Sequence, residues 1–156
     1  MEQLAANYRV TVIIIAAEIM TIIALTVAAW FDIFKFESAA SPSTITTLWI
    51  AIIFIAVGSF ILRRAFFNWE KLADTILLKG KSGLIKQLQS NAIILSALAE
   101  IIAIIGFVIT ALTGDKFQTL RASAIALIVC LINFPRRRVW EKVVESLEKL
   151  DAGEVR

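Results

Sequence analysis

Residues 92–113, AIILSALAEIIAIIGFVITALT, decide the fold of this chain. A helix needs about 20 predominantly apolar residues to cross a bilayer, and this stretch has that length and composition. Its one ionisable side chain is Glu100, which follows Asn91 by nine residues. At about 1.5 Å of rise per residue the carboxyl lies about 13 Å deep, near the middle of a ~30 Å hydrocarbon layer. We therefore predict a membrane-spanning helix whose buried acid faces protein or water rather than lipid.

The composition of the whole chain is that of a membrane protein. Of its 156 residues, 59% are hydrophobic and only 19% are charged, and the mean hydropathy is +0.82. Soluble domains carry about 25% charged residues, spread more evenly over the chain. Three further apolar runs, at residues 10–31, 46–62 and 118–134, bring the predicted spans to four. The first run follows Arg9 as a signal peptide would, but its length and the presence of Glu18 favour a retained span. We predict an all-α membrane protein.

Basic residues gather on one side of the predicted membrane. Six Lys and Arg lie in the middle loop (63–91) and six in the tail (135–156), whereas the two hairpin tips hold only Lys35, Lys116 and Arg121. Lys and Arg concentrate in cytoplasmic loops. We therefore expect a multi-pass protein of a bacterial inner membrane, with both termini and the middle loop in the cytoplasm. The basic pairs and triplets beside the spans are expected to anchor this topology and to contact lipid headgroups; they are Arg63, Arg64, Arg136, Arg137 and Arg138.

Amphipathic helices are predicted on the cytoplasmic side. In the middle loop, Leu72 and Ile76 belong to an apolar face with helical spacing, and in the tail Val139, Val143 and Leu147 do the same. Acidic residues dilute the positive charge of both segments. We therefore expect these extensions to pack together rather than to bind lipid through charge alone.

The chain reads as a duplicated hairpin. With an offset of 82 residues, AAEIMTIIALTVAA (16–29) falls on LAEIIAIIGFVITA (98–111), and Glu18 falls on Glu100. After each second span the sequence RRAFFNWEKL (63–72) matches RRRVWEKV (136–143). We predict two tandem, like-oriented hairpin repeats, residues 1–91 and 92–156, within one membrane domain. Two spans per repeat imply a pseudo-twofold axis along the membrane normal.

Small residues recur along one face of the first and third spans. They follow a spacing of four and three residues, as residues that share one helical face do. Apolar helices in lipid have no hydrophobic driving force for association. Membrane helices therefore pack through small side chains, which allow their backbones to approach closely. The predicted packing stripe consists of Ala17, Ala24, Ala28, Ala99, Ala103, Gly106 and Thr110.

Two interpretations of the acids stay open. Glu18 and Glu100 lie beside the stripe, and Thr21 and Ser96 are placed to hydrogen-bond them. In the first interpretation each Glu is protonated and fixes the register of neighbouring helices. In the second, one or both face a water-filled path and bind a proton or a cation, as acids inside membranes commonly do.

Short stretches around the acids look like two membrane families. Glu100 with the following Ala103 and Gly106 resembles the ion-binding helix of rotary ATPase proteolipids. Ala17 and Glu18 resemble the first helix of small multidrug-resistance transporters, which carries a Glu that binds protons and substrate. The long loop between the second and third spans breaks both patterns, and the chain is assigned to neither family.

Composition favours transport or assembly over catalysis. The chain has no His, and its one Cys, Cys130, lies in an apolar run where a small buried hydrophobe is expected. No nucleophile with an activating base, zinc spacing or phosphate loop is present, so we expect no enzyme, metal, cofactor or nucleic-acid partner. The leading hypothesis is a small oligomeric membrane protein that conducts ions or couples to protons along a path lined by Glu18 and Glu100. One alternative is a non-catalytic accessory or scaffold subunit of a larger membrane complex. A second is a pore-forming effector gated by a cytoplasmic signal.

Overall fold

The computed structural model describes residues 2–31 and 41–151, with side chains to residue 147. This part of the chain is helical and contains no strand. Its elements are α1 (Glu2–Trp30), α2 (Pro42–Phe66), α3 (Trp69–Thr113), α4 (Lys116–Asn133) and α5 (Arg137–Asp151). Four helical segments are long and apolar enough to cross a membrane: α1, α2, α3 and the segment that begins with α4. The predicted all-α architecture with four such helices is confirmed, and the predicted tip that carries Lys35 lies outside the described residues.

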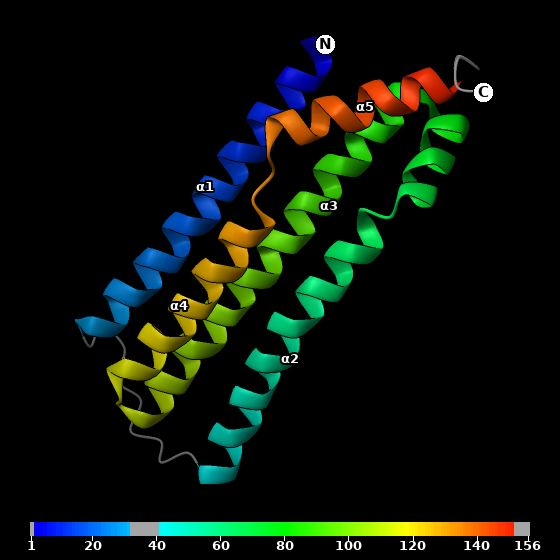
Figure 1. Cartoon of the computed structure of the whole chain (residues 1–156). Coiled ribbons are helices and arrows are strands. Elements are labelled where there is room, and N and C mark those ends of the chain that lie inside the picture. Colours follow the sequence, from blue (N-terminus) through cyan, green and yellow to red (C-terminus); the bar gives the residue numbers. More distant parts are fainter. Residues whose placement is uncertain (1, 32–40, 152–156) are drawn as a thin grey trace.

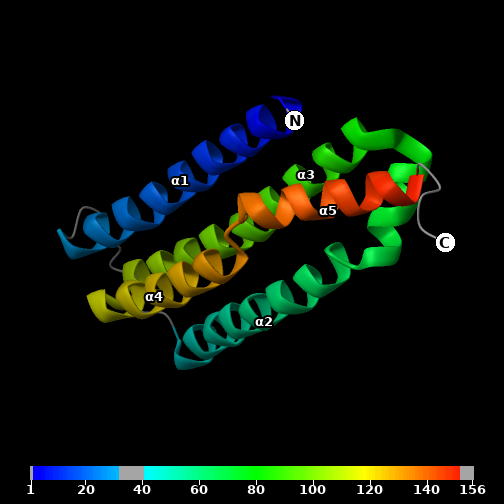
Figure 2. The same ribbon diagram turned by 45° about the horizontal axis from the view of Figure 1, so that its top comes forward.

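The helices run alternately up and down, with α3 at the centre. Helix α3 contacts α1, α2, α4 and α5, and its closest partner is α4. Helices α1 and α2 lie on opposite sides of the α3–α4 hairpin, as both views show (Figures 1 and 2). The start of α1, the start of α3 and α5 gather at one end of the bundle (Figure 1).

The close contact between α3 and α4 depends on small side chains. A Cβ atom added to Gly106 would lie 2.1 Å from the Cβ of Ala122, so only glycine permits this approach. Ala103 and Ala126 are fully buried in the same core. The Thr119 hydroxyl donates to the Gly106 carbonyl at 3.1 Å. Small residues and hydroxyls are the usual means of joining helices where no hydrophobic effect drives them together.

Helix α1 presents a different kind of face to the bundle. Its buried residues are Leu4, Thr11, Ile15, Ile22 and Ala29, which share one face of the helix, and the half-buried Glu18 belongs to that face. By contrast, Ala17, Thr21 and Ala24 are exposed, and Ala28 is half-buried. Ala17, Thr21 and Ala24 therefore point away from the bundle, whereas Ala29 is buried in it. The small residues of α3 point into the bundle: Ser96, Ala99, Ala103, Gly106 and Thr110 are buried.

A second core lies at the end of the bundle that holds α5. Its members are Leu4, Leu72, Ile76, Leu84, Ile85, Leu88, Ala92, Trp140, Val144 and Leu147. Helix α3 bends at Gly80, and residues on both sides of the bend belong to this core. The φ of Gly80 is 66°, a value that glycine adopts at little cost. Two contacts tie α1 to the start of α5: the Tyr8 hydroxyl donates to the Pro135 carbonyl at 3.2 Å, and the Tyr8 and Trp140 rings meet edge to face at 5.6 Å. The amphipathic segments therefore pack against each other.

The two sequence halves do not pack alike. Helices α3 and α4 form a closed hairpin, whereas α1 and α2 are separated by that hairpin (Figures 1 and 2). Trp69 and Trp140, which the sequence alignment pairs, are 47% and 1% exposed. The duplication stays a prediction from the sequence, and each half has its own tertiary environment.

Candidate functional site

Polar side chains from two other helices lie within electrostatic range of Glu18. Glu18 comes from α1, Ser96 and Glu100 from α3, and Cys130 from α4. The Ser96 hydroxyl and the Glu100 carboxyl are both close enough to the Glu18 carboxyl to influence it electrostatically. The Cys130 thiol is also within electrostatic range of Glu18. We call these four residues the acid cluster.

Glu18 is the centre of the acid cluster. Its position on the inward face of α1 directs the carboxyl toward α3, and the carboxyl oxygen Oε2 is buried with no hydrogen-bond partner. A buried polar atom without a partner costs roughly 1–3 kcal/mol, so proteins retain few of them. This oxygen is therefore a place where a proton or a cation can be held.

The four predicted polar residues have different surroundings. Ser96 is 2% exposed and donates to the Ile93 carbonyl at 3.0 Å while facing Glu18. Glu100 is half-buried at the flank of α3, and its carboxyl accepts no hydrogen bond from residues 2–31 and 41–147. Thr21 is exposed, and its hydroxyl donates to the Ala17 carbonyl of its own helix at 3.1 Å. The structure places Ser96 and Glu100 within electrostatic range of Glu18 and leaves Thr21 outside the acid cluster.

The cluster has the chemistry of a proton or monovalent cation site. Two carboxyl groups within electrostatic range can share one proton, because two adjacent negative charges repel each other. A cation held between the two carboxylates would also offset their mutual repulsion. In the part of the chain that the structure describes, no three His, Cys, Asp or Glu side chains gather closely enough to hold a metal ion.

No known family, curated protein or solved structure matches this chain.

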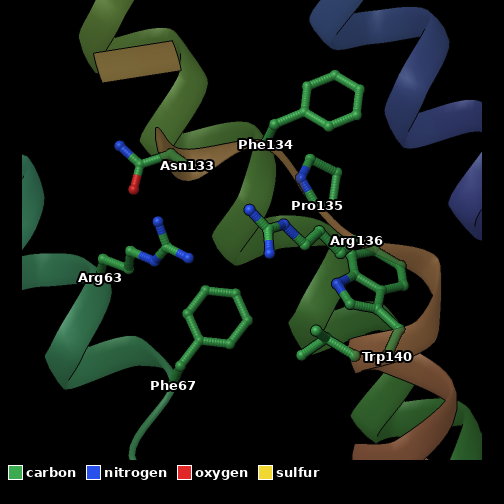
Figure 3. Close-up of a pocket in the computed structure, with 8 residues that line it drawn as sticks. Arg63, Phe67, Asn133, Phe134, Pro135, Arg136 and Trp140 are labelled. Carbon is green, nitrogen blue, oxygen red and sulfur yellow. The ribbon is translucent and has the colours of Figure 1, made fainter. Parts of the chain in front are cut away.

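The predicted headgroup arginines fall into two groups. Arg63, at the end of α2, and Arg136, just before α5, line a pocket with Phe67, Asn133, Phe134, Pro135, Val139 and Trp140 (Figure 3). Arg64, Arg137 and Arg138 lie outside this pocket; they are exposed, as Arg136 is, and Arg137 pairs with Glu141 at 2.8 Å within α5. Only the first two of the five thus belong to a shaped site.

Sequence reasoning missed Asn133 and did not anticipate Cys130 beside an acid. Asn133 ends α4 and is 7% exposed, yet neither Nδ2 nor Oδ1 has a hydrogen-bond partner. The one available signal was a carboxamide at the end of an apolar run. The arginines that line the same pocket, Arg63 and Arg136, come from separate parts of the sequence.

Proposed function

We propose that this chain is a small integral membrane protein that passes protons or cations along a path lined by Glu18 and Glu100. The observation that carries the proposal is the buried, unpartnered Oε2 of Glu18, with the Glu100 carboxyl and the Ser96 hydroxyl within electrostatic range of the same carboxyl. A membrane-embedded acid costs several kcal/mol unless protein or water shelters it, and such acids mark ion and proton routes. The concentration of basic residues around α5 and the start of α3 supports a topology with both termini in the cytoplasm.

The path belongs to an oligomer rather than to one chain. Ile15, Ile22 and Ile102 are at most 1% exposed around the acid cluster, so the interior of a single bundle is filled with side chains. The exposed Ala17, Thr21 and Ala24 give α1 an outer face of small residues. Such a face allows the backbone of another membrane helix to approach closely. A second copy on this face would place a subunit boundary beside Glu18.

Flux through reconstituted protein tests the proposal. Purified protein in liposomes with an internal pH-sensitive dye should show a proton or cation flux. We expect Glu18→Gln/Glu100→Gln, which keeps the side-chain size and removes both charges, to lower that flux at least about tenfold. A tenfold change in rate corresponds to only about 1.4 kcal/mol, and a cation without its counter-charge inside the membrane costs roughly 2.5 kcal/mol or more. Glu70→Gln is the matched control, because Glu70 is an exposed acid in the first turn of α3.

Two results would count against this role. A flux that is unchanged in the double variant would show that the acids do not line the path. A flux that falls as much in Glu70→Gln would show that the loss comes from general charge rather than from the acid cluster.

The exposed small face of α1 also supports an alternative function. A non-catalytic accessory subunit of a larger membrane complex would use the same residues to contact a different protein. Extraction of the native protein in mild detergent separates the two proposals. A homomer of this chain favours conduction, whereas a stoichiometric complex with a larger partner favours the accessory role.

A further inference from the structure

A pocket at the end of α4 collects positive charge without acidic partners. Figure 3 shows Arg63, from α2, and Arg136, from the α4–α5 connection, extending toward the same space. Arg63 donates one hydrogen bond from Nη1 to the Ile132 carbonyl. Among the described residues, no carboxylate forms an ion pair with either arginine. Two guanidinium groups that share a pocket without a carboxylate favour an anion between them.

Asn133 is an independent sign that this pocket binds a ligand. Its side chain is more than nine-tenths buried, it lines the pocket, and both polar atoms of its carboxamide lack partners. Nearly all buried amides in proteins are hydrogen-bonded. An anion with several oxygen atoms would accept a hydrogen bond from Nδ2 while it accepts others from the two arginines.

The rest of the pocket indicates an amphipathic ligand of modest size. Its volume is about 170 Å³, which is below the roughly 300–1,000 Å³ of pockets for drug-sized molecules. Phe67, Phe134 and Trp140 supply an apolar wall beside the arginines. The pocket lies where the apolar α2 and α4 end, which is the depth of lipid headgroups.

We propose that this pocket binds a phosphate group, and that an anionic phospholipid supplies it. The phosphate lies between Arg63 and Arg136 and accepts a hydrogen bond from Asn133 Nδ2, while the glycerol and first methylene groups contact the aromatic wall. Arginine suits this role because its planar donors match phosphate oxygens in pairs. The site joins α2 to α5, so the bound lipid connects the membrane bundle to the second core.

Native mass spectrometry of the full-length protein in detergent tests the site. The protein is titrated with phosphatidylglycerol and, in a parallel experiment, with zwitterionic phosphatidylcholine. Binding of inorganic phosphate is measured separately, by the shift in the protein's thermal unfolding midpoint. We expect one phosphatidylglycerol per chain to bind at least about tenfold more tightly than phosphatidylcholine. Arg136→Gln should raise the dissociation constant for phosphatidylglycerol about tenfold or more, because the loss of one hydrogen bond to a charged group changes an affinity by about that factor. Arg63→Gln should act in the same direction.

Neighbouring arginines provide matched controls. Arg64→Gln and Arg138→Gln remove the same charge from exposed positions outside the pocket, and binding should change little. Arg136→Lys, which keeps the charge, should restore part of the affinity and shows that the variant protein is folded. Equal losses in all four Gln variants, or equal binding of the two lipids, would overturn the proposal. Inorganic phosphate that stabilises the protein as much as lipid does, with the same dependence on Arg136, would keep the phosphate site and overturn the lipid as its source.

Discussion

The Glu18 carboxyl is partly removed from solvent and has few hydrogen-bond partners. The residue lies on the one face of α1 that packs into the bundle, and a neighbouring serine and acid come from α3 rather than from its own helix. Replacing this acid with an apolar residue would relieve the desolvation penalty, so structure alone gives little reason to keep it. Its buried Oε2, which has no hydrogen-bond partner, is the position that the proposed proton or cation would occupy.

Gly106 sets the separation of α3 and α4, and a single methyl group tests this. We expect Gly106→Ala to lower the free energy of unfolding by about 1–3 kcal/mol, since the added Cβ would lie 2.1 Å from the Cβ of Ala122 and force the helices apart. Gly58→Ala is the matched control, because nothing lies within 4 Å of a Cβ at that position of α2. The measurement is the thermal unfolding of both variants in detergent, followed by circular dichroism. Equal midpoints for the two variants would contradict the close contact.

At the scale of the elements, Trp140 is the largest buried side chain that holds α5 to the bundle. This side chain is 1% exposed, packs in the second core and meets the Tyr8 ring. Removing a buried aromatic side chain costs about 3–5 kcal/mol. We therefore expect Trp140→Ala to release α5, seen as faster protease cleavage within residues 137–147 while α3 and α4 stay protected.

Trp69→Ala is the control for this prediction. The sequence alignment pairs Trp69 with Trp140, but Trp69 is 47% exposed, so its loss should leave cleavage nearly unchanged. Equal sensitivity of the two variants would mean that the two halves of the chain are more alike in packing than the structure describes.

The existence of the four apolar helices was predictable, but their neighbours were not. A span of about 20 apolar residues is visible in any hydropathy reading. In a membrane helix, however, both the lipid face and the protein face are apolar, so periodicity does not reveal which side is buried. Small residues identify the buried face of α3, where Ala99 and Ala103 are enclosed, whereas on α1 the larger Ile15 and Ile22 fill that role and Ala17 is exposed.

The two candidate sites were predictable to different degrees. Glu18 and Glu100 stand out in the sequence because an acid inside an apolar run is rare. The phosphate pocket is not visible there, because Arg63 and Arg136 come from separate helical connections and look like ordinary topology anchors. Arg63 and Arg136 lie near Asn133 because the ends of α2 and α4 are neighbours in the fold. Local sequence patterns do not predict that arrangement.

At the scale of the whole molecule, the central claim is that both acids are sheltered from lipid within an assembled bundle. Site-directed spin labelling in bilayers measures this directly, because oxygen concentrates among acyl chains and a water-soluble nickel chelate does not. The chain contains one cysteine, so Cys130→Ala provides a background for labels introduced by Glu18→Cys and Glu100→Cys. Met20→Cys and Ile104→Cys are controls on the same helices, at side chains that are 64% and 44% exposed. We predict several-fold lower collision with oxygen at positions 18 and 100 than at 20 and 104; equal oxygen collision at all four positions would contradict the account.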